Sequence, residues 1–508
     1  MTSNTKQVIR LHERDNVVIA LRNLQLGEAV GDIHEAIPQA VSQGHKMASN
    51  DIAAGENVLR YGQIIGQAAT AIQKGEHVHS HNLMMGEHTQ SYDFSSQNTA
   101  LPAIQSTRTF MGYKRNSGRV GTRNYIGILT SVNCAGSVAR FIAEAAEKNG
   151  LLDEFENVDG IVPIVHGSGC GMSSEGEGYQ TLFRTLSGYG KHPNFGAILL
   201  VGLGCEVMQV PDLVGEHKSR ERGDFRYMII QQQGGTRQTI ETGLEHIRDL
   251  AAHANKIQRS EAPVSELMIG MQCGGSDGYS GITANPALGY ASDLLVRHGG
   301  TTILSETSEI YGAEHLLTRR AANAEVGQKL IDRIHWWEDY CARNGGEMDN
   351  NPSPGNKRGG LTTILEKSLG AVAKGGTAPL TAVYRFAEPV VEHGMVFMDS
   401  PGFDPCSVTG QVASGANLIV FTTGRGSVSG YKPTPCIKLA TNTEMYERLS
   451  EDMDLNCGDI VSDGVSLEQK GEELFELIIR IASGEESKSE ALGFGGAEFV
   501  PWQIGAVM

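Results

Sequence analysis

The sequence predicts an α/β protein with a small β-rich N-terminal domain, followed by a large α/β region of mostly parallel strands in two subdomains. The chain has 508 residues, more than one hydrophobic core usually serves, so several domains are expected. Residues 1–85 consist of short β-like runs broken by Gly, Asn and Asp. From about residue 112, apolar runs that end in Gly-rich loops alternate with helical stretches, which indicates buried parallel strands joined by crossover helices.

The predicted boundaries follow changes along the chain. We assign residues 1–85 to the β-rich domain, and 86–110 to a polar linker rich in Ser, Thr and Gln. The Pro/Gly/Asn-rich stretch that begins near Asp349 is expected to divide the α/β region into 111–350 and 351–508. Parallel sheets bind ligands beyond the carboxyl ends of their strands, so the Gly-rich loops are where we expect the chemistry.

Charge and composition exclude several functions. The chain carries 42 Lys and Arg against 59 Asp and Glu, a net charge of -17 without any dense basic tract, which argues against nucleic acid and anionic membrane surfaces as partners. Its apolar runs are shorter than the roughly 20 residues that a membrane helix needs, and the N-terminus lacks the apolar core of a secretory signal. We therefore predict a cytoplasmic protein. Its eight cysteines are too sparse for a disulfide scaffold.

The first candidate metal site is the stretch KGEHVHSHNL, in which His77, His79 and His81 alternate strictly. On an extended strand, alternate side chains lie about 6.6 Å apart on one face, so two imidazoles can bind one ion, while three cannot unless the strand bends. His45, in the stretch GHK, is the candidate third ligand, because metal–nitrogen bonds are only about 2.1 Å long. A solvent-facing strand edge with ordinary histidines is the other interpretation.

The cysteines form a second candidate centre. Four of them end apolar runs where a Gly-rich loop begins: Cys134, Cys170, Cys205 and Cys273. If one doubly wound sheet holds these runs, the thiolates converge and could bind iron or an iron–sulfur cluster with an open coordination position. Packing is the other interpretation, because Cys is a small apolar residue and local CxxC spacing is missing. The remaining four are predicted to pack in the core: Cys341, Cys406, Cys436 and Cys457.

Several loops supply groups that a hydroxy-acid site requires, since Arg binds carboxylates through two hydrogen bonds and Gly lets backbone N–H groups approach an anion. The candidate substrate-binding residues are Arg123, Asn124, Ser276, Asn356 and Arg425, and the candidate catalytic residues are His45, Asp277 and Lys357. Each of these loop residues could instead be a solvated turn residue. A complete dinucleotide fingerprint, a GxSxG elbow and a P-loop lysine motif are all missing, so acid–base chemistry is favoured over hydride or phosphoryl transfer.

Seven motifs along the chain together resemble the altronate/galactarate dehydratase family: GEHVHSHN, GYKRNSGRVGTRN, GLGCE, IIQQQ, GMQCGGSDGYSGITANP, DNNPSPGNKRGG and FTTGRG. The resemblance runs from about residue 8 to the C-terminus, and its longest motifs cover Cys273–Pro286 and Asn351–Gly360. GEHVHSHN and the three glutamines at 231–233 look like the altronate branch of the family. NSGRVGTRN running into TSVNC is closer to the galactarate branch in places.

The resemblance implies an N-terminal SAF domain, an α/β catalytic region and a metal-dependent hydro-lyase. Fe(2+) is the first expected cofactor, Mn(2+) the second, and an iron–sulfur cluster the alternative. The expected reaction takes the C2 proton from a sugar acid such as D-altronate and expels the 3-hydroxyl, which gives 2-keto-3-deoxy-D-gluconate. His77 and His79 with His45 are expected at the metal, or one of them as acid/base. Arg123, Lys357 and Arg425 are expected at the substrate, and Asp277 as base or orienting group.

Alternatives remain open at the level of sequence. The substrate could be galactarate or another C3-substituted acid such as sulfolactate, and the N-terminal module could be regulatory while the α/β part alone is catalytic. A sugar-acid binding protein without activity is a third reading. In each case the expected partner is a small-molecule sugar acid, with no nucleic acid and no membrane. The sequence leaves open whether the chain forms a homo-oligomer.

Overall fold

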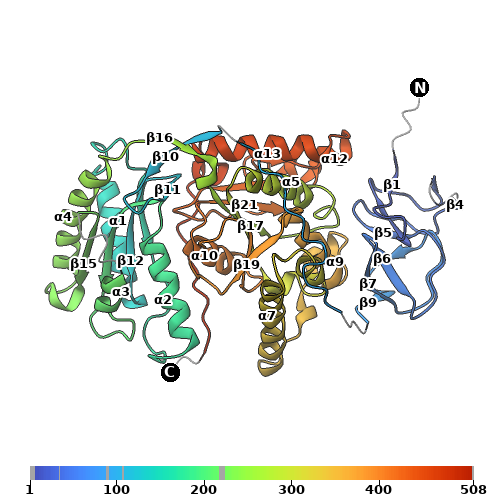
Figure 1. Ribbon diagram of the computed structural model, residues 1–508, viewed down its shortest axis with the longest axis horizontal. Coiled ribbons are helices and arrows are strands. Elements are labelled where there is room, and N and C mark those ends of the chain that lie inside the picture. Colours follow the sequence, from blue (N-terminus) through green and yellow to red (C-terminus); the bar gives the residue numbers. More distant parts are fainter. Residues whose placement is uncertain are drawn as a thin grey trace.

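Three structural units make up the chain in the computed structural model, which describes residues 6–31, 33, 35–86, 91–105, 108–216 and 223–505. In Figure 1, the N-terminal β domain lies at one end, a domain built on a seven-stranded parallel sheet lies in the centre, and a domain built on a four-stranded parallel sheet lies at the other end. The predicted fold class is confirmed. The last unit of the sequence therefore lies between the first two.

The N-terminal domain is built from short strands separated by turns, as the broken apolar runs predict. Its sheets have the orders β1-β2-β5-β8, β6-β7-β9 and β3-β4, with antiparallel pairing. The strands are β1 (Val8–Ile9), β2 (Val17–Ala20), β3 (Ala29–Val30), β4 (Glu35–Ala36), β5 (Lys46–Ala48), β6 (Asn57–Arg60), β7 (Gln63–Ala68), β8 (His77–Val78) and β9 (Leu83–Met84). Aliphatic side chains such as Val18, Leu24 and Met47 fill one of its cores.

The second domain is a parallel sheet in the order β13-β12-β14-β15. Helices α1 and α4 pack on one face, and α2 packs on the other beside α10 of the central domain. Its elements are β12 (Tyr125–Thr130), α1 (Gly136–Lys148), β13 (Gly160–Ile164), α2 (Glu177–Gly190), β14 (Phe195–Gly202), α3 (Val210–Glu216), β15 (Phe225–Ile229) and α4 (Thr236–Ala254). Every residue of β14 is buried, which explains its uninterrupted apolar sequence.

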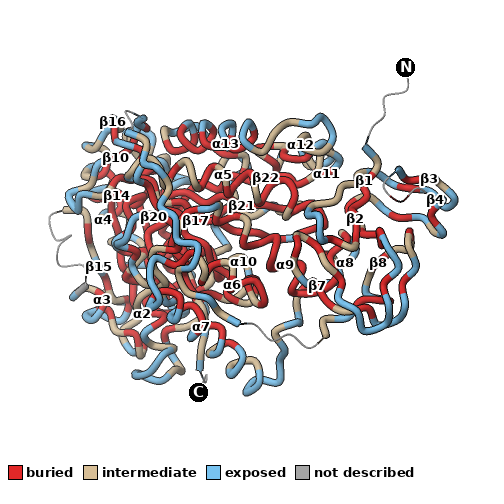
Figure 2. The backbone as a smooth tube through the Cα atoms, turned by 45° about the vertical axis from the view of Figure 1, so that its right-hand side comes forward, coloured by how far each residue is buried: buried red, intermediate tan, exposed pale blue. Residues whose placement is uncertain are grey.

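The central domain holds a parallel sheet in the order β19-β20-β18-β17-β21-β22-β23. Its strands are β17 (Met268–Cys273), β18 (Thr301–Leu304), β19 (Leu380–Tyr384), β20 (Gly394–Met398), β21 (Leu418–Thr423), β22 (Cys436–Ala440) and β23 (Leu455–Asn456). Its helices are α5 (Ala284–Arg297), α6 (Glu314–Thr318), α7 (Ala324–Arg343), α8 (Pro354–Arg358), α9 (Ile364–Val372), α10 (Asp404–Ser414), α11 (Thr443–Arg448), α12 (Asp459–Ser462), α13 (Leu467–Ala482) and α14 (Lys488–Ala491). In Figure 2, the backbone of β17 and β21 is buried and exposed segments lie around it.

Two further features connect the units. A small antiparallel sheet in the order β11-β10-β16 joins the two α/β domains, through β10 (Thr109–Lys114), β11 (Val120–Gly121) and β16 (Ser260–Pro263). The described part of the predicted linker follows the surface of the central domain, where the amide N–H groups of Ser95 and Gln97 donate to the carbonyls of Thr318 and Arg319.

No helix in the described ranges is both long and apolar enough to cross a bilayer.

The predicted division at residue 350 is wrong. Strands β17 and β18 precede that position, yet they lie in the same sheet as β19 to β23, so the two α/β domains divide before β17 instead. The Pro/Gly/Asn-rich stretch is a loop with the short helix α8, inserted between α7 and α9 of one domain. In sequence, such a stretch looks like a linker between domains. The strand order shows that it is not one, and that order depends on contacts between residues far apart in sequence.

The order of the central sheet creates a switch point beside β17. From β17 the chain adds β18, β20 and β19 on one side, and then returns to place β21, β22 and β23 on the other. In open parallel sheets, ligands bind at the carboxyl ends of the strands on either side of such a point. The loops after β17 and β21 begin here with Gly274 and Gly424.

Candidate active site and metal centres

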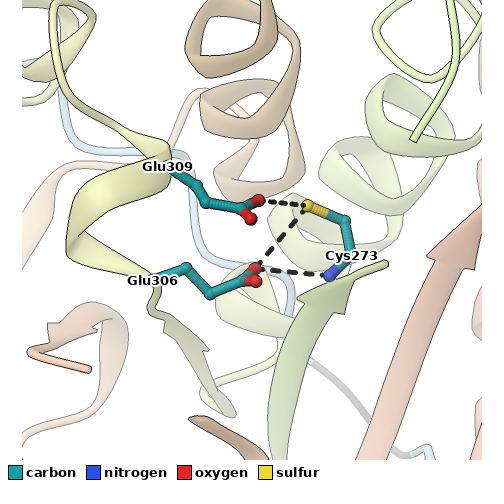
Figure 3. Close-up of side chains that lie close together, drawn as sticks. All are labelled: Cys273, Glu306 and Glu309. Carbon is teal, nitrogen blue, oxygen red and sulfur yellow. Dashed lines mark hydrogen bonds between the residues drawn. The ribbon is translucent and has the colours of Figure 1, made fainter. Parts of the chain in front are cut away.

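A buried polar cluster lies at the carboxyl ends of β17 and β18 (Figure 3). Cys273 is the last residue of β17, and Glu306 and Glu309 come just after β18. The Sγ atom of Cys273 is 3.6 Å from Oε2 of Glu306 and 3.4 Å from Oε2 of Glu309. Within the described residues, these three are the one group of Cys, His, Asp or Glu whose possible ligand atoms all lie within 4.8 Å of one another.

Two buried lysines complete this cluster. The Nζ atom of Lys374 is 2.9 Å from both Cys273 Sγ and Glu306 Oε2, and Nζ of Lys367 donates to Oε1 of Glu309 at 2.6 Å. Two ammonium groups thus lie against the carboxyl groups of Glu306 and Glu309 inside the protein. Because the carboxylates already have cationic partners, the arrangement fits an acid–base network better than a divalent cation site.

The environment of Glu306 shifts its acidity toward neutral pH. Burial first, and then the charge of Glu309, raise the pKa of Glu306 to about 8, although Lys374 opposes the shift. Burial likewise raises the pKa of Asp404, whose Oδ1 accepts a hydrogen bond from Gln272, to about 6. A carboxyl group that keeps its proton near pH 7 can serve as a general acid, and shifts of this kind are typical of functional sites.

The histidines of the N-terminal domain gather at a second place. The ring centroids of His45, His77 and His79 are 5.1 to 5.3 Å apart, and His45 Nδ1 is 3.0 Å from His77 Nε2. Burial lowers the pKa of His45 to about 4 and that of His77 to about 3, and it also lowers the pKa of His79. All three imidazoles are therefore neutral near pH 7, which is the form that binds metals.

The chain does not stay extended through these histidines. Strand β8 contains only His77 and Val78, and a turn follows in which the amide N–H groups of Asn82 and Leu83 donate to the carbonyl of His79. This bend brings the rings of His77 and His81 to a centroid distance of 5.6 Å. Nε2 of His79 and Nε2 of His45 meet the carbonyl oxygens of Lys357 and Arg358, at 2.8 and 3.2 Å.

The segment 351–360 links the histidine group to the strand ends. At its start, Nδ2 of Asn351 donates to Glu309 in the buried cluster at 2.9 Å. In the middle, Nδ2 of Asn356 donates at 2.8 Å to the carbonyl of Ser276, in the loop after β17, and Ser353 with Asn356 forms the capping box that begins α8. At its end, the carbonyl of Gly360 accepts a hydrogen bond from Lys46 of the N-terminal domain.

The candidate Asp277 is buried and fully engaged in holding its own loop. Its carboxylate accepts hydrogen bonds from Tyr279 N–H, Ser280 Oγ, Thr441 Oγ1 and Asn442 Nδ2. Burial raises the pKa of Asp277, and these hydrogen bonds oppose the shift. Of its two predicted roles, base or orienting group, the geometry favours the orienting group.

The other candidates in the strand-end loops lie in the same region. Ser276 and Asn356 are buried, Lys357 is half-buried, and Arg425 is exposed in the loop after β21, where its N–H donates to the carbonyl of Gly275. Among the predicted candidates in these loops, Lys357 and Arg425 are the two cations, and both are at least partly exposed.

Arg123 and Asn124 lie elsewhere. Both come before β12, at the amino end of its sheet, and not in the loops beyond the carboxyl ends. Arg123 is buried and binds Glu490 at 2.7 Å, while Asn124 donates to the carbonyl of Ala254 at 3.1 Å. Their prediction as substrate-binding residues is replaced by a structural role, because every polar contact described for them joins parts of the protein.

The four strand-end cysteines do not converge, because they belong to two sheets. Cys134, Cys170 and Cys205 are exposed and follow β12, β13 and β14 of the second domain, whereas Cys273 is buried in the central domain. Of the four predicted to pack, Cys406, Cys436 and Cys457 are buried and Cys341 is half-buried. The idea of one centre with four thiolates is therefore not supported by this fold.

The residues missed from sequence are Glu306, Glu309, Lys367 and Lys374. Glu306 directly follows the apolar run TTILS, so its place at a strand end was a detectable signal. Its backbone φ of 72° lies in the left-handed region, which is uncommon for a residue with a side chain and occurs often at functional sites. Nothing in the local sequence marks the two lysines.

The fold and these groups define a class of protein. In this class, a parallel α/β domain has an acid–base cluster at a strand switch point, and a small β domain that carries histidines lies over that point. Family models match the chain in three consecutive parts: the altronate/galactarate dehydratase SAF domain over residues 6–86, the D-galactarate dehydratase/altronate hydrolase second domain over 112–255, and the D-galactarate/altronate dehydratase C-terminal domain over 264–507.

Similarity to characterised proteins covers nearly the whole chain. It is 35% identical to altronate dehydratase of Bacillus subtilis over 94% of this chain and 96% of the relative. It is 38% identical to galactarate dehydratase (L-threo-forming) of Escherichia coli over 94% and 93%, and 36% identical to altronate dehydratase of the same organism over 96% and 97%. The chain belongs to the altronate/galactarate dehydratase family.

Proposed function

We propose that this protein is a hydro-lyase that converts D-altronate into 2-keto-3-deoxy-D-gluconate and water. Family membership supports a sugar-acid dehydratase, and the histidine stretch GEHVHSHN supports the altronate branch. The observation that carries the proposal is the segment 351–360, which ties the neutral histidines to the acid–base cluster at the switch point. The substrate would bind where these groups and Arg425 meet.

Neutral imidazoles suit Fe(2+), with Mn(2+) as the second candidate, so His77 and His79 would hold the ion and His45 would lie beside it. A bound ion would supply a Lewis acid that stabilises the negative charge on the substrate carboxylate as the C2 proton leaves. The cluster of Cys273, Glu306 and Glu309 is the less suitable metal site, because Lys374 and Lys367 already donate hydrogen bonds to its carboxyl oxygens.

The protein's own residues would carry the proton transfers. His45, neutral near pH 7, takes the proton from C2 while the C3–oxygen bond breaks, and Glu306 protonates the departing hydroxyl so that it leaves as water. The enol then receives the proton from His45 at C3 and returns its hydroxyl proton to Glu306, which restores both groups and gives the 2-keto acid. Lys357 and Arg425 would bind the carboxylate of the substrate.

A substrate panel tests this proposal. Keto-acid formation should be measured with D-altronate, galactarate and sulfolactate, using protein purified anaerobically and supplied with Fe(2+). We expect altronate to have a kcat/KM at least about tenfold above the others, the discrimination that one substrate group can provide. Preference for galactarate would replace altronate as the substrate, and binding of altronate without turnover would identify a sugar-acid binding protein instead.

A further inference from the structure

Three cysteines of the second domain lie together and outside the site described so far. Cys134, Cys170 and Cys205 lie in the loops that follow β12, β13 and β14. These strands are neighbours in the order β13-β12-β14 and run parallel, so the three loops begin at the same edge of the sheet.

Backbone hydrogen bonds hold the three loops against one another. The N–H of Asn133, beside Cys134, donates to the carbonyl of Ser168 at 2.9 Å. The carbonyl of Gly169, beside Cys170, accepts from the N–H groups of Val207 and Met208 at 3.0 Å each, and these follow Cys205 by two and three residues. Each cysteine is thus within a few residues of a direct bond between loops.

A buried carboxylate strengthens the same contact. Oε1 of Glu206, the residue after Cys205, accepts a hydrogen bond at 2.6 Å from Ser131 Oγ, in the loop that leads to Cys134. It also accepts at 3.1 Å from the N–H of Leu203. Glu206 therefore fixes the positions of two of the three cysteine loops.

The three thiols are exposed, which sets them apart from the other cysteines. Cys273, Cys406, Cys436 and Cys457 are buried and Cys341 is half-buried. An unliganded Cys behaves as a small apolar residue and is usually buried. In the ranges that the structure describes, no hydrogen bond or ion pair engages the thiols of Cys134, Cys170 or Cys205, so core packing does not explain their position.

Glycines shape the backbone around two of these thiols. Gly169 and Gly171 flank Cys170 with φ values of 96° and 62°, and Gly204 precedes Cys205 with φ of 125°. These conformations are open to Gly and strained for other residues. Loops of this kind turn successive N–H groups toward an anion, and such concave backbone surfaces occur at many iron–sulfur sites.

The sulfur atoms are not close enough together for all three to bind one ion. Sulfur ligands about 2.3 Å from one ion lie at most about 4.6 Å apart. Among the described residues, these three cysteines do not form a set with all sulfur atoms within 4.8 Å of one another. Each thiolate of an iron–sulfur cubane binds a different iron atom, so a cluster accommodates wider separations.

We propose that Cys134, Cys170 and Cys205 bind a [4Fe–4S] cluster whose fourth iron has no thiolate from this chain. The site goes beyond the proposed function, since neither the histidine group nor Glu306 uses it. Assembly from two Fe(II), two Fe(III) and four sulfide ions gives a core of charge 2+, so no oxidant is consumed. Three thiols each lose one proton and form an Fe–S bond, and the fourth iron keeps a water or takes a carboxylate or hydroxyl oxygen.

Full-length protein purified anaerobically tests the proposal by its content of iron and acid-labile sulfide. After reconstitution with Fe(II), Fe(III) and sulfide, we expect four sulfides per chain and a brown visible absorbance. Cys134→Ser, Cys170→Ser and Cys205→Ser should each lower the affinity for the cluster at least about tenfold. Cys341→Ser, in α7 of the central domain, is the matched control and should keep the wild-type sulfide content.

A second measurement covers variants that fail to fold. Alkylation of wild-type protein, followed by mass spectrometry of its peptides, should show these three thiols protected when the cluster is present and modified after its removal. Wild-type protein without acid-labile sulfide would overturn the proposal, as would iron bound without sulfide or equal alkylation in both states. Sugar-acid turnover is a separate readout, so loss of the cluster with turnover retained would leave the proposed function standing.

Discussion

At the scale of single residues, the histidine group has the contacts from which a metal test can be designed. His77 packs against the rings of His45, His79 and His81. His77→Ala removes a proposed ligand, so we expect Mn(2+) affinity to fall at least about tenfold and turnover to fall with it. Isothermal titration of cluster-free protein measures the affinity, and exposed His393 provides the control variant His393→Ala. Unchanged affinity in His77→Ala would remove the histidines from the metal site.

Glu306 gives the pH dependence of the reaction a definite sign. Its pKa is raised to about 8, and a general acid must hold its proton, so turnover should fall as the pH rises through about 8. In Glu306→Gln, the group that titrates is gone, so we expect a kcat lower by about 100-fold or more and no loss of rate across that pH range. Exposed Glu451→Gln should keep the wild-type profile. A wild-type profile in Glu306→Gln would show that another group donates the proton.

The sequence predicts the histidines and the strand-end loops, but not the role of every residue in them. Asp277 and Arg123 look alike in sequence as polar residues in Gly-rich turns. Only the tertiary contacts separate an orienting carboxylate from an arginine that joins domains. Glu309 and Lys374 were not predicted. Their partners, Lys367 and Glu306, reach them only through packing between α9, β18 and the 3-10 helices at Thr307–Glu309 and Ala373–Gly375, and local sequence carries no record of that packing.

At the scale of elements, helix α9 joins the N-terminal domain to the catalytic region. Glu366 on this helix accepts hydrogen bonds from Lys46 and Arg60, and all three side chains are fully buried. Burial alone would raise the pKa of Glu366, but the two cations and the hydrogen bonds lower it to about 2. The next residue, Lys367, binds Glu309 in the acid–base cluster. Because Glu366 and Lys367 are adjacent on α9, the position of the helix determines both contacts together.

Glu366→Gln should destabilise the protein by about 3–5 kcal/mol, because it leaves two buried cations without their anion. A carboxyl group with a depressed pKa stabilises the folded protein at pH values above its ordinary pKa near 4.5. This stabilisation is lost as the pH falls toward about 2. Urea unfolding at pH 7 and at pH 3.5 measures both effects, and the variant should lose less stability than wild type between them. The exposed pair Arg108–Glu476 supplies the control, since Glu476→Gln should cost at most about 1 kcal/mol.

Helix α8 and the loop after β21 carry the proposed anion-binding groups, Lys357 and Arg425. Lys357→Ala and Arg425→Ala each remove a cation from the substrate carboxylate, so kcat/KM on altronate should fall at least about tenfold. Bound metal and thermal stability should change little, because both side chains lie at least partly in solvent. Exposed Lys6→Ala is the control. Wild-type kinetics in both loop variants would show that these loops lie outside the active site.

At the scale of the whole molecule, the fold class could be predicted and the division of the chain could not. Alternating apolar runs and Gly-rich loops report each buried strand locally, and the strands of the two large sheets are parallel as expected. The order of the central sheet, in which β21 returns beside β17, depends on contacts across roughly 150 residues. For the same reason, the assignment of Cys273 and Cys170 to different sheets was not visible in the sequence.

The proposed metal dependence is a property of the complete enzyme. Treatment with a chelator should abolish turnover, because the ion stabilises the charge that develops on the substrate, and Fe(2+) or Mn(2+) should restore it. Restoration in sulfide-free protein would assign the effect to the histidine site, and a requirement for sulfide would assign it to the cysteine cluster. Full activity in metal-free protein would contradict metal dependence at either site.

The buried contacts of Glu366 have a consequence for how the chain comes apart. The contact of Glu366 with Lys46 and Arg60 is fully buried. It lies between two units that the linker at 86–110 also connects. Covalent continuity is therefore not what keeps the N-terminal domain in place. A protease cut in the linker should leave two fragments that co-elute as one particle, and heating should melt them in a single transition. After such a cut, the histidines would still lie at the strand ends.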